Sequence, residues 1–344
     1  MTFPRYVLIG HNVVEQTGDL VERLGWARRA LIVSDERTKP IAGDAAGKVL
    51  AASGFHSEFA IINGASMASV EQVKAQAFRS KADFLIGAGG GSVIDVTKLS
   101  AYELDRPFIS MPTSAAHDGI ASGRASIKEN QGNVSKAAKP PDAIVADTAL
   151  ILKAPYRMLA SGCGDMMANL VAVKDWELAH KLKGEEFSTF AASLSLNSAQ
   201  LVIEDRKKIK PNSEEAVWTV VKSLIGSGVA MSIAGDSRPA SGSEHMFSHM
   251  LDRLAPGQAM HGEQCGVGSI MMMRLHGGDW RTIKETLELV KAPVTAKELH
   301  IPRDTIVDAL VGAHKIRPDR YTVLGEKGIT KERALELARE TGVL

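Results

Sequence analysis

The stretch DFLIGAGGGSVIDVTK, residues 83–98, decides how the first half of the chain should fold. It holds an apolar run of strand length, then glycines at positions 87, 89, 90 and 91, then an apparent helix that begins near Ser92. Glycines at a strand-to-helix turn let the backbone approach a diphosphate closely, and the first amides and dipole of the helix favour the anion. A glycine run alone is a weak signal and fits a tight turn without a ligand. Its place after a strand strengthens the prediction of a dinucleotide site.

Strand-length apolar runs alternate with helical patterns up to about residue 150, which predicts a Rossmann-like α/β domain with a parallel sheet over residues 1–154. The runs are 6–9, 30–33, 58–62, 84–86, 108–110 and 144–146. After Pro155, apolar positions recur at helical spacing, as in 214–235 and 280–291. We therefore expect an all-helical domain over 155–344, with the active site in the cleft between the two domains, where ligands commonly bind.

Composition narrows the choice of partners. The 344 residues include 41 Lys and Arg against 40 Asp and Glu, a net charge of +1, which argues against nucleic acid or an anionic membrane as the main partner. The first twelve residues lack the pattern of a signal peptide. The apolar stretch 224–235 is too short to span a bilayer and predicts a buried helix. Cys163 and Cys265 suggest neither a disulfide framework nor a metal motif, so we expect a cytoplasmic protein without membrane insertion.

The glycine stretch departs from the common dinucleotide fingerprint, which follows the first strand and has its ribose-binding acid about 20 residues later. Here the glycines follow the fourth strand, and the best acid, Asp35, ends the second. Asp35 could accept hydrogen bonds from the adenosine ribose and favour NAD, while Arg37 and Lys39 could tolerate the 2′-phosphate of NADP. A helix N-cap is an equally good interpretation of Asp35.

Three residues of the helical half suggest a metal site. Asp165 lies in an apolar segment at a probable helix start, so its carboxylate should be paired or ligating. His245 and His261 follow in separate apparent helices, and one Asp with two His suits zinc with an open position, or iron or another divalent ion. A single histidine is more often structural, and we expect His180 and His276 to be surface or packing residues.

The stretch GSEHMFSHM, residues 242–250, places His245 and His249 four apart, on one face of a helix. Both could hold a metal, one could hold a metal while the other handles a proton, or both could simply be buried. The spacing alone leaves all three open.

Six segments together resemble the sn-glycerol-1-phosphate dehydrogenases, a family within the metal-dependent alcohol dehydrogenase and dehydroquinate synthase superfamily. The resemblance runs from about residue 5 to the C-terminus, with the motifs in the expected order. The segments are GGGSVIDVTK, PTSAAHDGIAS (112–122), KPPDAIVADT (139–148), ASGCGDMMAN (160–169), GSEHMFSH (242–249) and HGEQCGVG (261–268).

The resemblance implies a role for each matching position. Asp165, His245 and His261 would bind zinc. Asp165 and His249 would also act in catalysis and contact substrate, and Asp118 would contact substrate. Asn169 stands where some iron-type relatives have a ligating histidine, which favours the three-ligand set. The residues that would line the dinucleotide are Gly91, Ser92, Val93, Ile94, Asp95, Thr113, Ser114, Ala115, Ala116 and Ser122.

The implied reaction is reversible reduction of dihydroxyacetone phosphate to sn-glycerol 1-phosphate by NADH or NADPH, with one zinc per subunit. The product would supply archaeal-type ether phospholipids, and the resemblance suggests a homo-oligomer. His249 is the first choice to supply a proton and His117 the second. Cations for the substrate phosphate could come from the segment between the HDG and KPP motifs, unless it is a solvated loop; they are Arg124, Lys128, Lys136 and Lys139.

Three rival functions remain from the residues alone. A glycerol dehydrogenase of the same superfamily would share the zinc and NAD residues but act without phosphate. A dehydroquinate synthase-like lyase would need more polar groups around its substrate. A catalytically silent binding protein should lack one of Asp165, His245 and His261, and none is missing.

Overall fold

The computed structural model describes residues 2–129 and 132–344. The chain forms two compact units. The first unit consists of residues up to Ala115, Gly119–Tyr156 and Asn212–Val221, and the second of Ala116–Asp118, Arg157–Pro211 and Lys222–Leu344. The units therefore do not follow the expected ranges 1–154 and 155–344 residue for residue, because short segments of each range pack with the other unit.

A six-stranded parallel sheet forms the centre of the first unit, which confirms the predicted α/β class. The strand order is β1-β8-β5-β4-β2-β3. The strands are β1 (Tyr6–Gly10), β2 (Arg29–Ser34), β3 (His56–Ile61), β4 (Phe84–Gly89), β5 (Phe108–Pro112) and β8 (Ala143–Asp147). Each of the six expected runs is one of these strands.

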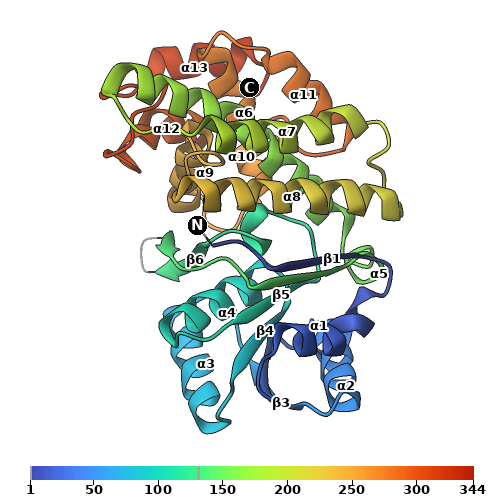
Figure 1. Ribbon diagram of the computed structural model, residues 1–344. Helices are drawn as coiled ribbons and strands as arrows, with labels where there is room; N and C mark the ends of the chain where they lie inside the picture. The colour runs from blue at the N-terminus through green and yellow to red at the C-terminus, as the bar shows by residue number, and fades with distance from the viewer. Residues whose placement is uncertain (1, 130–131) are drawn as a thin grey trace. The chain divides into compact units, whose positions relative to one another are not determined.

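Helices cover both faces of this sheet (Figure 1). Side chains alternate along a buried strand, so Ile32 and Ile86 face one layer while Leu31 and Leu85 face the other. The first layer contains α1 (Thr17–Leu24) and α2 (Asp44–Ala52), with the short η1 (Val13–Gln16) and η2 (Lys39–Gly43). The second contains α3 (Met67–Arg79) and α4 (Gly91–Glu103). Two buried faces explain why the strands are apolar throughout.

A second, antiparallel sheet joins β6 (Arg124–Glu129) and β7 (Gly132–Ala137), where the sequence analysis expects no strand. The signal is a short alternation: Ala125 and Ile127 are buried, and charged or polar residues lie between and around them. The segment is otherwise rich in charged and polar residues, as a solvated loop would be, so two alternating apolar residues did not predict a strand. The hairpin is followed by β8 and the one-turn helix α5 (Thr148–Ile151).

The second unit is built from helices, as the spacing after residue 155 predicts. They are α6 (Tyr156–Lys183), α7 (Thr189–Asp205), α9 (Ser243–Leu254), α10 (His261–Leu275), α11 (Trp280–Leu289), α12 (Arg303–Gly312) and α13 (Lys331–Glu340), together with most of α8 (Glu214–Ala234) and the short η3 (Asp118–Ile120) and η4 (Ala313–Lys315). Helix α8 begins in the first unit and continues into the second.

Helix α8 is longer than the apolar stretch 224–235 suggests, at 21 residues. Among the described residues it is the one helix long and apolar enough to cross a membrane by length and composition. However, 72% of its most apolar 18-residue window is buried inside the protein, as in a core helix. The expected buried helix is therefore present, although the argument from insufficient length was wrong.

Helices α6 and α10 approach so closely that their backbones touch. A Cβ atom on Gly164 would lie 2.2 Å from the carbonyl oxygen of Gly262, and one on Gly262 would lie 2.0 Å from that of Ser161. Only glycine permits this approach. It brings the residue after Gly164 and the residue before Gly262 close together, and these are Asp165 and His261.

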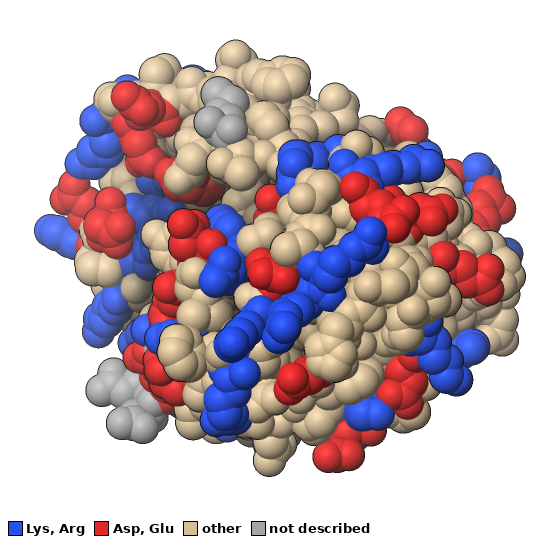
Figure 2. Space-filling view, turned by 60° about the horizontal axis from the view of Figure 1, so that its bottom comes forward, with Lys and Arg blue, Asp and Glu red and all other residues tan. Residues whose placement is uncertain are grey.

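Charged side chains of both signs are mixed over the face drawn in Figure 2. Basic residues form a short diagonal band there, with acidic residues on both sides of it. This mixture fits the near-zero net charge of the chain.

Candidate functional site

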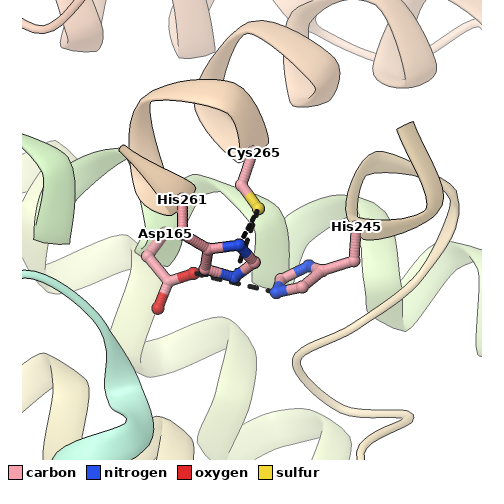
Figure 3. Close-up of side chains that lie close together, drawn as sticks. All are labelled: Asp165, His245, His261 and Cys265. Carbon is pink, nitrogen blue, oxygen red and sulfur yellow. Dashed lines mark hydrogen bonds and ion pairs between the residues drawn. The ribbon is translucent and has the colours of Figure 1, made fainter. Parts of the chain in front are cut away.

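Four side chains of the second unit converge, with potential ligand atoms all within 4.8 Å of one another (Figure 3). They are Asp165 of α6, His245 of α9, and His261 and Cys265 of α10. Both imidazole Nε2 atoms lie near Asp165 Oδ1, at 3.8 Å for His245 and 3.7 Å for His261. One carboxylate oxygen and two imidazole nitrogens suit zinc or iron with a position left open for substrate. The structure thus brings the three expected ligands together.

The Asp165 carboxylate is buried, and burial raises its pKa to about 7, although the hydrogen bond from the Asp118 backbone N–H opposes the shift. That N–H donates to Asp165 Oδ2 at 2.9 Å. Oδ1 is the oxygen that faces the two histidines. A cation among these groups would favour the ionised carboxylate, so the donor set fits a divalent metal.

Glu244 holds the His245 ring. Its Oε1 lies 2.8 Å from His245 Nδ1 and also accepts a hydrogen bond from the Gly242 N–H at 2.7 Å. A carboxylate on Nδ1 places the ring proton there and leaves the Nε2 lone pair for a metal. Burial first, and then the charge of Asp175, raise the pKa of Glu244 well above its ordinary value. Burial also lowers the pKa of His245 well below its ordinary value, so the ring is neutral and able to ligate.

His261 is oriented in a similar way. The Ser248 hydroxyl donates to Gln264 Oε1 at 2.7 Å and lies 3.2 Å from His261 Nδ1, so it can accept the proton of that nitrogen. His261 Nε2 then carries the lone pair that could ligate a metal. Arg157 forms a two-point ion pair with buried Glu263, which also accepts from the Met260 N–H and so fixes the start of α10.

Cys265 is the member of the cluster that the sequence analysis missed. Its Sγ lies 3.6 Å from His261 Nε2, and burial, followed by the charges of Asp165 and Glu244, raises the pKa of the thiol well above its ordinary value. Cys163 and Cys265 are too far apart in the sequence to form a paired-cysteine metal motif. The signal lay in the spacing His261-x-x-x-Cys265, which puts both side chains on one face of a helix.

His249 lies beside the cluster and is not one of its four members. Its ring centroid is 6.2 Å from that of His245 and 5.8 Å from that of His261. Burial first, and then the neighbouring positive charges, lower its pKa to about 3. Its Nδ1 is buried and has no hydrogen-bond partner among the described residues.

A polar network runs from the cluster into the helical core. Ser227 donates to Asp118 Oδ2 at 2.8 Å and lies 3.2 Å from the amide nitrogen of Asn169. Asn169 is fully buried and also donates to the Ser195 carbonyl. Asn169 therefore supports Asp118 rather than adding a ligand next to Asp165.

The expected dinucleotide residues of the first unit lie where three adjacent strands end. Strands β2, β4 and β5 are parallel neighbours, so the positions after them (Asp35, Gly90 and Thr113) lie at the same edge of the sheet. The strand order reverses between β2 and β4, since β3 lies on one side of β2 and β4 on the other. Ligands of open parallel sheets bind at the carboxyl ends next to such a switch point.

Two glycines of the turn serve different purposes. A Cβ on Gly89 would lie 2.6 Å from Val93, so this glycine lets α4 pack against β4. A Cβ on Gly90 would meet nothing nearer than Ser114 Oγ, at 3.8 Å. Gly90 has φ −75°, which any residue can adopt, so packing does not require a glycine there. The open space beside Gly90 fits the close approach of a diphosphate.

The remaining expected dinucleotide residues divide into open and buried positions. Ser92 is exposed and Gly91 and Ala116 are half-buried, whereas Val93, Ile94 and Ala115 belong to the core. Asp95 is buried and is paired with Lys98 at 3.1 Å, and it accepts from the Ser126 N–H. Thr113, Ser114 and Ser122 are buried, and Ser122 Oγ donates to the Arg124 carbonyl.

Asp35 closes a local turn. Its Oδ1 accepts hydrogen bonds from the backbone N–H groups of Arg37 and Thr38 and from the Thr38 hydroxyl. Asp35 is therefore a turn residue and not the helix N-cap that the sequence offered, because the N-cap of η2 is Thr38. Oδ2 makes no hydrogen bond with the described residues and could accept one from a ribose hydroxyl, so the ribose role stays a prediction.

Several other expected residues have structural partners. The His276 side chain is 9% exposed and has its Nε2 3.0 Å from Asp175 Oδ1, while His180 is exposed and has its Nδ1 near the Glu185 carbonyl. Arg124 donates to Ser135, and Lys136 is paired with Glu129. His117 lies 6.5 Å from His261, ring to ring.

The family model described as iron-containing alcohol dehydrogenase matches residues 8–155 of the chain. A glycerol dehydrogenase structure from Schizosaccharomyces pombe has TM-score 0.83 at 21% identity, with 99% of this chain and 89% of that chain covered. A sulfoacetaldehyde reductase from Bifidobacterium kashiwanohense in complex with NAD+ has TM-score 0.77 at 16% identity, with 99% and 97% covered.

Relatives named glycerol-1-phosphate dehydrogenase [NAD(P)+] are far more similar in sequence. The protein from Methanosarcina mazei is 50% identical over all of this chain and 96% of its own length, and that from Thermococcus sibiricus is 51% identical over all of this chain and 98% of its own length. The chain belongs to the glycerol-1-phosphate dehydrogenase family. It is an NAD(P)-dependent, metal-dependent oxidoreductase that acts on a small molecule.

Proposed function

We propose that the protein reduces dihydroxyacetone phosphate to sn-glycerol 1-phosphate, reversibly, with NADH or NADPH and one zinc ion per subunit. The observation that carries this proposal is the convergence of Asp165, His245 and His261 from three helices, in a chain about 50% identical to glycerol-1-phosphate dehydrogenases over its full length. The product would supply ether phospholipids of the archaeal type. The enzyme would act in the cytoplasm as a homo-oligomer.

Asp165, His245 and His261 would hold the metal, which supplies Lewis-acid polarisation of the substrate carbonyl when bound. Glu244 and Ser248 keep both imidazole Nε2 atoms deprotonated and aimed at Asp165 Oδ1. Asp118 would bind a substrate hydroxyl, because Ser227 holds its carboxylate beside Asp165.

His249 lies beside the cluster, so its imidazole ring would contact substrate. With a pKa near 3 the ring is neutral, so it can pass on a proton that it holds on one nitrogen but is not a charged acid at neutral pH. His117 is the second candidate for handling the proton.

The dinucleotide would bind at the carboxyl edge of the first unit. The amides of Gly91, Ser92 and Val93 begin α4, so no residue of the helix can accept their hydrogen bonds, and they are available to the diphosphate. The other proposed contacts are Asp35, Ile94, Asp95, Thr113, Ser114, Ala115, Ala116 and Ser122. For the buried members we expect backbone contacts, since their side chains pack in the protein.

The test follows nicotinamide absorbance with NADH and either dihydroxyacetone phosphate or dihydroxyacetone, before and after removal of metal with a chelator. We expect a strong preference for the phosphorylated ketone, loss with the metal and recovery with zinc, and a chiral analysis should then give the sn-1 product. Equal use of dihydroxyacetone would move the protein to the glycerol dehydrogenases. If NADH is oxidised with neither ketone, the dehydroquinate synthase-like lyase and the catalytically silent binding protein become the better interpretations.

The ligand set has its own test in the cobalt-substituted protein. We expect a spectrum without a thiolate-to-cobalt charge-transfer band, because three protein ligands leave a position for substrate while Cys265 stays a protonated neighbour. Cys265→Ser should leave the spectrum unchanged, and Cys163→Ser is the matched control. A charge-transfer band lost only in Cys265→Ser would make the thiol a fourth ligand, and stoichiometric metal in His261→Ala would remove His261 from the set.

A further inference from the structure

One face of α9 carries a line of nitrogen-bearing side chains that leads away from the metal cluster. His245, His249 and Arg253 are spaced four apart, so each lies one turn beyond the last. His249 is about 6 Å along the helix from His245, and Arg253 about as far again. A short phosphate ester with its carbonyl at the cluster would therefore place its phosphate near His249.

The segment after α12 packs on the same helix. Helix α12 and η4 both contact α9, and a Cβ on Gly312 would lie 2.8 Å from Met250. Farther along, the Val323 N–H donates to Asp175 Oδ1, and Asp175 Oδ2 accepts from the Ser243 N–H at the start of α9. Residues 312–323 are thus fixed to α9 at both ends.

Two arginines of this segment lack strong carboxylate partners. Arg320 is half-buried and donates through Nη1 to Ser237 Oγ and the Ser241 carbonyl, and it forms no ion pair with a described residue. Burial first, and then the charges of Arg317 and Arg238, lower its pKa to about 10. Arg317 is paired with exposed Asp319 alone, at 3.7 Å.

The neighbouring Arg238 shows the contrast, because its guanidinium is neutralised by a two-point ion pair with Glu185. Near His249 the neutralisation is weaker: among the described residues Arg317 has only the ion pair with Asp319, and the positive charges of Arg317 and Arg253 both contribute to the low pKa of His249, after burial and His261. Several cations gathered with so few anions are costly. A doubly negative ligand would offset that cost, and guanidinium groups bind phosphate with paired hydrogen bonds.

We propose that Arg317, Arg320 and His249, with the exposed Arg253 at the rim, form the subsite for the phosphate of the substrate. This inference rests on the proposed function. It is an alternative to the candidates in and beside the β6–β7 hairpin, of which Arg124 and Lys136 have partners within the hairpin. The guanidinium group of Arg317 makes the direct contact, and Arg320 adds positive charge and holds the segment through its hydrogen bonds to Ser237 and Ser241.

The test compares Arg317→Gln with wild type in the metal-loaded enzyme. We expect KM for dihydroxyacetone phosphate to rise about ten- to a hundredfold, with kcat/KM for dihydroxyacetone unchanged within twofold. Arg317→Lys should recover part of the loss, because it restores charge but not the paired hydrogen bonds. Arg281→Gln, an exposed arginine of α11, is the matched control, and Lys136→Gln and Lys139→Gln test the hairpin.

Binding of inorganic phosphate, followed by phosphorus NMR, separates this inference from the proposed function. Wild type should bind phosphate and Arg317→Gln should bind it at least tenfold more weakly, whatever the substrate proves to be. If wild type does not prefer the phosphorylated ketone, the proposed function fails and the phosphate measurement still decides the subsite. Unchanged phosphate affinity and KM in Arg317→Gln, or a rise in KM in the lysine variants instead, would overturn the inference.

Discussion

At the scale of single residues, the cluster depends on side chains that do not touch a metal. Glu244 and Ser248 each occupy the Nδ1 side of a histidine, so both Nε2 atoms turn the same way. Outer partners of this kind typically change metal affinity 10- to 100-fold. The metal affinity of this protein should therefore depend on them.

Glu244→Gln should weaken metal binding about tenfold, because a neutral amide makes His245 a poorer ligand. Competition with a coloured chelator measures the affinity, and circular dichroism checks the fold. Glu215→Gln, an exposed position on α8, is the control. Equal affinity in both variants would show that the Glu244 contact is structural alone.

The raised pKa of Asp165 predicts how metal binding depends on pH. The carboxylate must lose its proton to ligate, so affinity should fall about tenfold per pH unit below pH 7 and level off above it. His245 adds no slope there, since its pKa is already low. In the metal-free protein, ionising Asp165 costs stability as pH rises from about 4 to 7. Chelator competition from pH 5.5 to 8 measures the slope, and a flat profile would contradict the prediction.

The sequence was sufficient to predict Asp165, His245 and His261 as site residues, because aspartate and histidine are ordinary metal ligands. It could not identify Glu244, because a glutamate beside a histidine on a helix is ordinary until both its burial and its hydrogen bond are known. Arg317 and Arg320 could not be identified either, since only the packing of residues 312–323 on α9 brings their charges close enough to act on His249 and His245.

At the scale of elements, glycines set how closely helices and strands approach. Gly164 and Gly262 bring α6 against α10, while Gly89 brings α4 against β4. Each contact positions residues of the candidate sites. A methyl group added at these points should act on function through the distance between elements.

Gly164→Ala should separate α6 from α10, because its Cβ would lie 2.2 Å from a backbone oxygen that cannot rotate away. We expect a loss of about 1–3 kcal/mol in the free energy of unfolding and less bound metal, since Asp165 and His261 move apart. Thermal unfolding and metal analysis measure both. Gly47→Ala in α2, whose nearest neighbour is a ring atom of Phe59 at 3.2 Å, is the control and should keep its metal.

Gly90→Ala should leave stability unchanged, because the Cβ of the alanine would meet no protein atom nearer than 3.8 Å. It should weaken NADH binding, because the Cβ would lie in the space proposed for the diphosphate. Gly89→Ala should instead destabilise the fold through the clash with Val93. Fluorescence titration with NADH and thermal unfolding separate the two effects. Unaltered NADH affinity in Gly90→Ala would argue against a diphosphate at this turn.

The strands were predictable because six apolar runs stand between helical patterns, and 84–86 and 108–110 lie within the observed strands. The β6–β7 hairpin was not predicted, since only Ala125 and Ile127 mark its buried face. The order of the strands also stayed open, because apolar runs do not state which strand pairs with which.

At the scale of the whole molecule, the two candidate sites belong to different compact units. Ligands protect the amides of the regions that they stabilise. Hydrogen exchange should therefore show NADH protecting the ends of β2, β4 and β5 and the start of α4, and zinc protecting α6, α9 and α10. Chelator-treated protein with NADH is the control. Protection of the helices alone by NADH would contradict the proposed dinucleotide site.

The sharing of α8 between the units bears on how the chain is made. Residues 212–221 complete the first unit, where Glu214 accepts from Thr148 and lies beside His11. A ribosome that has released residue 156 has therefore not yet supplied all of that unit, and the nascent chain must keep it unfinished through the synthesis of α6 and α7. A gene fragment that ends at residue 154 would lack residues 212–221 permanently, so neither unit can be expressed as one uninterrupted piece of the sequence.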